Sequence, residues 1–230
     1  MATQKVIKKS VSKSKDFKKH NKREIEIIKS RFLEHYGDAK TELVYHNIYE
    51  LLVCVMLSAQ CTDKRVNLVT PALFKAYPNV ATLSQAHLED VKILIQSVSF
   101  FNNKAKHLIT MANQVMNDFN GEIPTTQAEL KTLAGVGQKT ANVVLIEFFE
   151  QNYMAVDTHV FRVSHRLGLS GAKSALETEK ELTQVFKTQL STLHQAFVLF
   201  GRYTCKALKP MCENCFVGEF CQKKCNFKPA

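Results

Sequence analysis

Apolar residues recur at intervals of three and four along nearly the whole chain, and this periodicity is what most constrains its fold. One stripe is formed by Ile25, Ile28, Phe32 and Tyr36, and residues 47–59 (NIYELLVCVMLSA) form a pattern typical of a buried helix. Further helical segments follow, separated by Pro, Asn or Gly. The alternation typical of strands is scarce, and no repeat of fixed period occurs. The sequence therefore predicts an all-α fold.

A glycine-rich connection interrupts this pattern at residues 133–144, which read LAGVGQKTANVV. Thr126 and Glu129 form a capping-box pattern that predicts a helix over TQAELKTL just before it. Gly135 and Gly137 allow positive φ, and the next helix offers unpaired N–H groups at the positive end of its dipole. This geometry suits one backbone phosphate, bound directly or through a monovalent cation. The alternative is an ordinary corner between two packed helices.

A lysine and an aspartate near this connection are the candidate catalytic pair. Lys139 lies in the first turn of the second helix, where the dipole disfavours a charged amine, and an uncharged amine is a nucleophile. The alternative role for Lys139 is a simple phosphate contact. Asp157, in AVDTHVFRV, is the candidate carboxylate partner, and it is also predicted to cap the helix that follows. The two roles of Asp157 are compatible, because a capping side chain is held rigidly.

Four cysteines near the C-terminus, Cys205, Cys212, Cys215 and Cys221, follow the spacing C-x6-C-x2-C-x5-C. Four thiolates bind either a [4Fe–4S] cluster or tetrahedral zinc. The six-residue gap suits the paired short knuckles of zinc sites poorly, so we favour iron–sulfur; Cys225 lies outside the spacing. A disulfide framework is disfavoured, since the chain shows no secretion signal. No apolar run is long enough to cross a membrane.

The positive charge is concentrated at the N-terminus. The chain has a net charge of +10, and residues 1–23 hold nine basic residues and one acidic residue, which leaves about +2 for the other 207 residues. The basic segment is expected to act as a flexible tail that attracts nucleic acid, or merely as a solubilising one.

Taken together, these motifs resemble the endonuclease III family of helix-hairpin-helix DNA glycosylases. The segment LLVCVMLSAQCTDKRVN is also similar to that family's LLSAQ-x-TD-x-x-VN pattern, and the resemblance covers roughly residues 24–225. It implies two helical domains that flank a DNA-binding cleft, after a tail at 1–20. One would be a six-helix barrel with the hairpin at 41–151, and the other an iron–sulfur domain formed by 21–40 with 152–226.

The resemblance also implies the chemistry. The substrate would be double-stranded DNA with damaged pyrimidines or abasic sites. Lys139 would attack C1′ of a flipped nucleotide, expel an oxidised base and form a Schiff base, and β-elimination would then break the strand on the 3′ side. Asp157 would activate the lysine and stabilise the cationic sugar. The protein would act as a monomer in the bacterial cytoplasm, associated with the nucleoid.

Five further residues would contact DNA on this interpretation. Gln60 would fill the gap left by the flipped base, and Phe100 stands where the family usually has a wedging leucine. The hairpin residues Gly135, Gly137 and Thr140 would contact the backbone. Gln60 could instead cap its helix, and Phe100 could belong to the core.

Three rival functions are compatible with parts of the sequence. Relatives that remove adenine from mismatches use a carboxylic acid in the buried helix, at the position that corresponds to Cys54 here. A non-catalytic DNA-binding module with a structural metal site would keep the hairpin without needing Lys139 and Asp157 together. A redox carrier is a third class, which one cluster loop on a large helical chain fits poorly.

Overall fold

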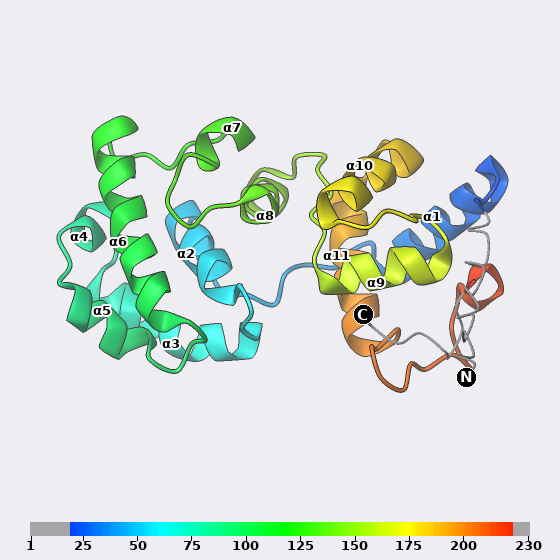
Figure 1. The fold of residues 1–230 in the computed structure, drawn as a ribbon, viewed down its shortest axis with the longest axis horizontal. Coiled ribbons are helices and arrows are strands. Elements are labelled where there is room, and N and C mark those ends of the chain that lie inside the picture. The colour runs from blue at the N-terminus through cyan, green and yellow to red at the C-terminus, as the bar shows by residue number, and fades with distance from the viewer. Residues whose placement is uncertain (1–18, 223–230) are drawn as a thin grey trace, which may run out of the picture.

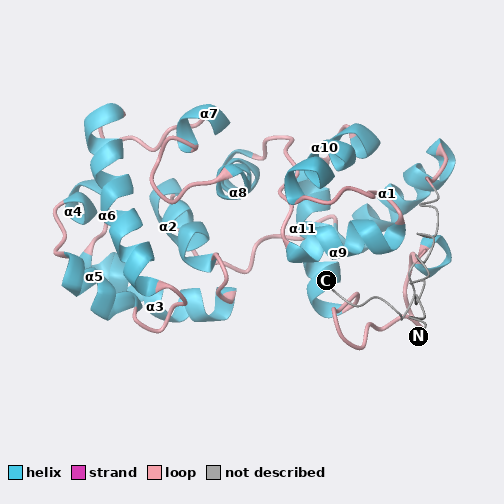
Figure 2. Ribbon diagram, viewed as in Figure 1, coloured by secondary structure: helices cyan, strands magenta, loops and turns pink. Residues whose placement is uncertain are grey.

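The computed structural model describes residues 19–222, and in this part of the chain it contains helices and no strand, as Figures 1 and 2 show. Most of the basic tail and Cys225 lie outside the described residues. The helices are α1 (Lys22–Tyr36), α2 (Ile48–Ser58), α3 (Asp63–Ala76), α4 (Val80–Ser84), α5 (Leu88–Ile95), α6 (Phe101–Asp118), α7 (Gln127–Leu130), α8 (Gln138–Phe149), α9 (Thr158–Leu167), α10 (Ala175–Phe186), α11 (Leu190–Tyr203) and the short 3-10 helix η1 (Gly218–Phe220). The prediction of an all-α fold is confirmed. None of the described helices is long and apolar enough to span a membrane.

Local capping sets most of the helix starts. In each case a side-chain oxygen accepts a hydrogen bond from the backbone N–H three residues later, which satisfies one of the unpaired donors of the first turn. The capping residues are Asn21, Asn47, Thr62, Asn79, Thr126, Asp157 and Ser174. Each cap joins residues only three positions apart, so the starts of these helices can be predicted from the sequence.

The helix before the hairpin is shorter than predicted. Thr126 caps it as expected, but α7 ends at Leu130. The next residues form tight turns, in which the N–H of Thr132 donates to the carbonyl of Glu129 and that of Leu133 donates to Leu130. The prediction of a helix through Leu133 is therefore wrong, because the chain tightens early to enter the hairpin.

The buried apolar residues form two cores. The first draws on residues between Leu43 and Ala155 and is built around α2, whose apolar side chains are almost entirely buried. The second combines α1 with α9, α10 and α11. In Figure 1 the first group of helices, α2 to α8, stands beside the second group, α1 with α9, α10 and α11. The segment that links α8 to α9 contributes to both cores, since Ala155 packs in the first core and its neighbours Met154 and Val156 pack in the second. The domain boundaries after residues 40 and 151 stay a prediction.

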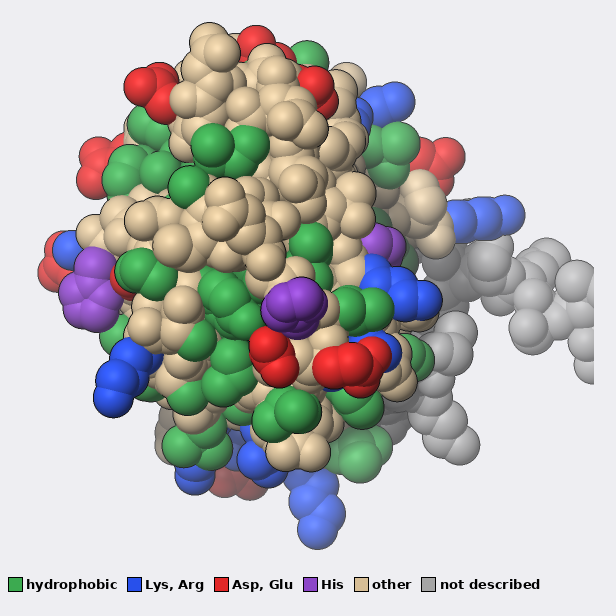
Figure 3. Space-filling model, turned by 90° about the vertical axis from the view of Figure 1, so that its left-hand side faces the viewer, with side chains coloured by type: hydrophobic (Ala, Val, Ile, Leu, Met, Phe, Trp, Pro, Cys, Tyr) green, Lys and Arg blue, Asp and Glu red, His purple; other side chains and the backbone are tan. Residues whose placement is uncertain are grey.

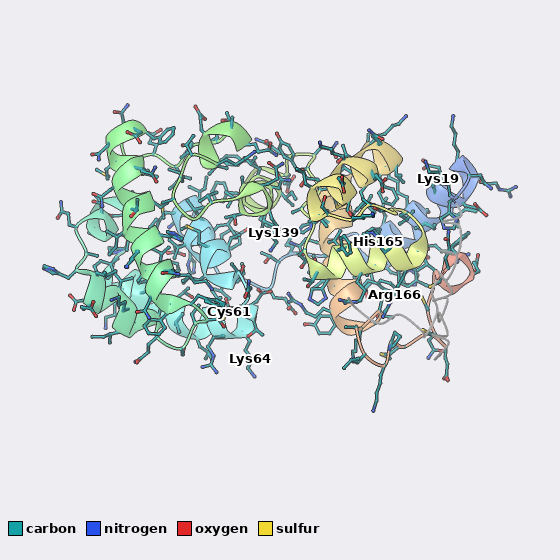
Figure 4. All side chains as sticks on the ribbon, viewed as in Figure 1. Lys19, Cys61, Lys64, Lys139, His165 and Arg166 are labelled. Carbon is teal, nitrogen blue, oxygen red and sulfur yellow. The ribbon has the colours of Figure 1, made fainter. Side chains whose placement is uncertain are left out.

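The end of the first group that carries α4, α5 and α6 has no charge of one dominant sign. Figure 3 shows that acidic and basic side chains are interspersed there among apolar ones. Lys139 of α8 lies instead toward the opposite side of this group, next to the second group of helices (Figure 4).

Candidate active site and cysteine cluster

The hairpin between α7 and α8 depends on two glycines in different ways. Gly135 has a φ of 78°, and a Cβ placed on it would lie 2.9 Å from Cβ of His107. Gly137 is the N-cap of α8, with a φ of −93° and no side chain to cap the helix. A Cβ on Gly137 would meet no atom within 4 Å, apart from its chain neighbours. The start of α8 is therefore an open, uncapped helix N-terminus, the geometry that favours an anion.

Lys139 and Asp157 line the same small cavity, of about 50 Å³, between the two groups of helices. Lys139 is exposed in the first turn of α8, and Figure 4 shows it at the junction of the two groups. Asp157 is half-buried at the start of α9, where its Oδ1 accepts from the N–H of Val160 at 2.8 Å. The predicted capping role of Asp157 is confirmed. Among the described residues no direct hydrogen bond or ion pair joins the two side chains, so the cavity between them is open to a substrate group.

Asp63, to which the sequence interpretation assigned no role, also lines this cavity, as does Glu42. Burial raises the pKa of the Asp63 carboxyl, and the nearby Lys139 amine lowers that pKa in part. Its Oδ2 lies 2.8 Å from Nη2 of Arg202 on α11, which also contacts Glu42. The segment LSAQCTD contains Asp63, but its long-range partner has no signal in the sequence.

His194 on α11 also faces the cavity and was also missed. It is only 2% exposed, and burial lowers the pKa of its imidazole to about 4, with Asp157 raising that pKa and Lys139 lowering it. Nδ1 of His194 is buried and has no hydrogen-bond partner among the described residues. Lys139 and Asp157 therefore lie beside a neutral imidazole, which adds no positive charge to the cavity.

The two residues that sequence reasoning assigned to DNA insertion lie on neighbouring loops. Gln60 is exposed, two residues past the end of α2, with a φ of 54°. Phe100 directly precedes α6, has a φ of 59° and is 63% exposed. The alternative that Phe100 belongs to the core is therefore wrong.

The four spaced cysteines converge, since all of them line one cavity of about 130 Å³. The almost fully buried Arg166 on α9 supports the site, because its Nη1 lies 3.2 Å from Sγ of Cys205 and also donates to the carbonyl of Lys206 at 2.7 Å. Burial raises the pKa of the Cys215 thiol, so bonding to a metal is what would hold it as a thiolate. The donors suit a soft metal group.

The donor set bears on which group the cysteines would hold. Within residues 19–222, no group of three or more His, Cys, Asp or Glu side chains has the geometry to hold a metal ion. Four thiolates are the ligand set both of a [4Fe–4S] cluster and of tetrahedral zinc. The four cysteines that line this cavity therefore fit a four-thiolate metal group of either kind.

Comparison with known proteins defines the class. Residues 53–188 match the family described as HhH-GPD superfamily base excision DNA repair protein, and this chain belongs to that superfamily. The matched range contains the second half of α2, the hairpin, Lys139 and Asp157, and it stops before the four cysteines.

Closer relatives narrow the assignment to the endonuclease III family. The chain is 43% identical to endonuclease III of Rickettsia felis over 83% of this chain and 90% of that protein. It is 42% identical to the Bacillus subtilis endonuclease III, over 88% and 94% of the two chains. Its fold is similar to that of endonuclease III in a trapped covalent intermediate with DNA, with a TM-score of 0.85, 40% identity and coverage of 89% of this chain and 97% of the other.

Proposed function

We propose that this protein is a DNA glycosylase that removes oxidised pyrimidines from duplex DNA and then cleaves the abasic site as a lyase. The observation that carries the proposal is the shared cavity of Lys139 and Asp157 beside an uncapped helix N-terminus. An amine, a carboxylate and a phosphate-binding backbone are the groups that this reaction needs.

The reaction proceeds by covalent catalysis. The uncharged Nζ of Lys139 attacks C1′ of the flipped nucleotide, and the bond from C1′ to the base breaks with its electron pair leaving on the base. Asp157 takes the proton from the amine, and its charge offsets the positive charge on the sugar. Ring opening gives a Schiff base, a proton then leaves C2′, and the 3′ phosphate departs with its C–O electrons. Hydrolysis of the Schiff base frees Lys139.

The surroundings of the pair fit this sequence of steps. His194 stays neutral because of burial, so it adds no positive charge beside an amine that must be uncharged to attack. Asp63 is anchored by Arg202 and adds negative charge close to the developing cation. We assign both of them to positioning and electrostatics, with Lys139 as the nucleophile.

The duplex is placed by contacts on both sides of the lesion. The backbone at Gly135 and Gly137, with Thr140, binds one phosphate, either directly or through a monovalent cation; varying K⁺ at constant ionic strength distinguishes the two. Gln60 fills the gap left by the flipped base, and Phe100 wedges against the opposite strand. A base excision enzyme with these contacts acts on chromosomal DNA, so we place it at the bacterial nucleoid.

The cysteine cavity holds a [4Fe–4S] cluster in this proposal. Cys205, Cys212, Cys215 and Cys221 would be its ligands, since they line one cavity and the six-residue gap between the first two suits zinc knuckles poorly. When bound, the cluster supplies four metal–sulfur bonds that fix the loop between the first two ligands. That loop exposes Lys206 and Lys209, which suit phosphate contacts.

The adenine-removing alternative lacks its acid in this chain. The corresponding residue, Cys54, is fully buried, and burial raises the pKa of its thiol to about 12. Its Sγ donates weakly to the carbonyl of Val44 at 3.6 Å. A neutral thiol packed in the first core cannot protonate a departing adenine.

Borohydride trapping tests the proposal. Incubation with duplex DNA that carries thymine glycol or an abasic site, in the presence of borohydride, should reduce the Schiff base to a stable adduct. The adduct should form with the native protein and disappear in Lys139→Ala while DNA binding persists. No adduct from the native protein on DNA that it binds would leave only a monofunctional enzyme or a binding module.

A further inference from the structure

A buried lysine lies beneath the two loops that carry Gln60 and Phe100. Lys104 belongs to the first turns of α6 and is only 8% exposed. Its Nζ donates to the carbonyl of Leu57 at 2.8 Å and to that of Ala59 at 2.6 Å. These carbonyls belong to the last turn and the C-cap of α2, so one side chain joins the start of α6 to the end of α2.

The bond pattern explains how a buried amine is tolerated there. The last carbonyls of a helix have no partner within it and carry the negative end of its dipole, so a cation satisfies them. Burial lowers the pKa of the Lys104 amine, and the neighbouring Cys61 opposes that change. A buried lysine that donates hydrogen bonds to backbone carbonyls of another helix acts as a crosslink, and the length of its side chain sets the distance between the two helices.

Both ends of this crosslink lead directly to an inserting residue. Gln60 follows Ala59, and Phe100 lies four residues before Lys104. Both have left-handed backbone conformations, which are strained for residues other than glycine and persist only where the surroundings impose them. The hollow beside these loops, of about 330 Å³, is lined by Gln60, Cys61, Thr62, Arg65, Ser97 and Ser99.

We infer that Lys104 is a positioning residue that fixes the spacing between Gln60 and Phe100, so that both enter the duplex together. This inference rests on the proposed function, which gives those two residues their roles. Gap filling and wedging act on the two strands of the same base-pair step, so their spacing must match the opened duplex. A misplacement of about 1 Å can lower a rate about 100-fold.

The test compares duplex and single-stranded substrates. Lys104→Met keeps an unbranched side chain that is one heavy atom shorter, and it removes the charge and both hydrogen bonds. An abasic site in single-stranded DNA has no opposite strand to wedge and no stack to fill, so it does not need the paired insertion. We expect Lys104→Met to lower the duplex cleavage rate about tenfold or more and the duplex-to-single-strand rate ratio about fivefold or more.

A second readout follows insertion without chemistry. With 2-aminopurine opposite an uncleavable abasic analogue, saturating native protein should unstack the probe and raise its fluorescence. Saturating Lys104→Met should raise it less than half as far. Lys104→Arg, which keeps the cation, should recover part of the signal and provides a folded variant if the methionine variant does not fold.

Lys29 offers a matched control. It is also 8% exposed, and its Nζ donates to Oγ1 of Thr188 at 2.8 Å, in the second group of helices. Lys29→Met should leave the rate ratio and the fluorescence response as in the native protein. A second control is Gln60→Ala with Phe100→Ala, in which adding Lys104→Met should change the ratio no further.

The outcomes are separable. Equal losses on duplex and single-stranded DNA, or the same fall in ratio for Lys29→Met, would show that Lys104 is only structural and overturn the inference. A further fall in the Gln60 and Phe100 double variant would do the same. A native protein that forms no borohydride adduct on either DNA would instead overturn the proposed function.

Discussion

The two hairpin glycines should respond in opposite ways to alanine. At Gly137, alanine fits the observed φ, and its Cβ meets no atom of the protein. The substitution should therefore affect the binding of a group at the helix N-terminus rather than the stability of the fold. Replacing a glycine that suits the N-cap costs about 1 kcal/mol, and the stiffer unfolded chain returns about 0.4–1 kcal/mol. We therefore expect the melting temperature of Gly137→Ala to stay within about 2 °C of the native value.

DNA binding by Gly137→Ala should nevertheless fall sharply. A methyl group at this position stands where a phosphate would reach the first N–H groups of α8. A hydrogen bond to a charged partner contributes about 1.5–3 kcal/mol, so losing one should weaken binding about 10- to 100-fold. The assay is fluorescence anisotropy with an abasic-analogue duplex at fixed salt, beside a thermal melt.

Gly135→Ala is the matched opposite case. Its φ of 78° costs an alanine about 1–2 kcal/mol, and the new Cβ would press on His107. The melting temperature should fall by about 2–8 °C. Native-like DNA affinity in Gly137→Ala would refute the phosphate assignment, and a large loss of stability in that variant would refute the claim that its Cβ meets open space.

Three other predictions concern pH, the metal site and the tail. Lowering the pH from about 6.5 toward 4 should reduce the free energy of unfolding by up to about 3 kcal/mol. The reason is that the imidazole of His194 is protonated in the unfolded chain over this range but stays neutral in the folded protein. Denaturant titrations at several pH values should show a smaller dependence of the free energy of unfolding on pH in His194→Gln. Cys212→Ser should lose the broad visible absorption of an iron–sulfur cluster, whereas Cys54→Ser should keep it, and a colourless native protein that contains zinc would contradict the cluster. Deleting residues 1–18 removes six lysines and one aspartate, and it should make DNA affinity less dependent on salt. The slope of log affinity against log salt concentration should fall by about 0.9 for each phosphate that the shortened chain no longer neutralises. An unchanged slope would show that the tail only aids solubility.

The helical fold was predictable because its determinants are local. Asn47 and Asp157 cap helices through backbone groups three residues away, and apolar periodicity marks which faces are buried. The prediction for α7 was right at its start and wrong at its end. The capping signal at Thr126 was correct, but the hydrogen bonds that end the helix at Leu130 belong to the turn geometry of the hairpin, which no short pattern encodes.

The candidate site was predictable only in part. Lys139 and Asp157 carry their own sequence context, a glycine hairpin and a helix cap. Asp63 and His194 do not, because what makes them part of the site is a fold that brings α3 and α11 to the same cavity. Arg202 holds Asp63 across 139 positions of sequence, and such a pairing leaves no periodic or local trace.

The same long-range contacts explain how the candidate catalytic pair, Lys139 and Asp157, keeps its geometry. Lys139 begins a helix of the first core and Asp157 begins a helix of the second, so their separation depends on how the two cores meet. Polar bridges join the cores there: Arg202 pairs with Asp63, and Gln195 of α11 donates to the carboxylate of Glu147 on α8. A partly exposed ion pair contributes only about 0–1 kcal/mol to stability. Its directionality, however, fixes orientation in a way that apolar contact does not, and the proton transfer from Lys139 to Asp157 that we propose depends on the orientation of the two groups.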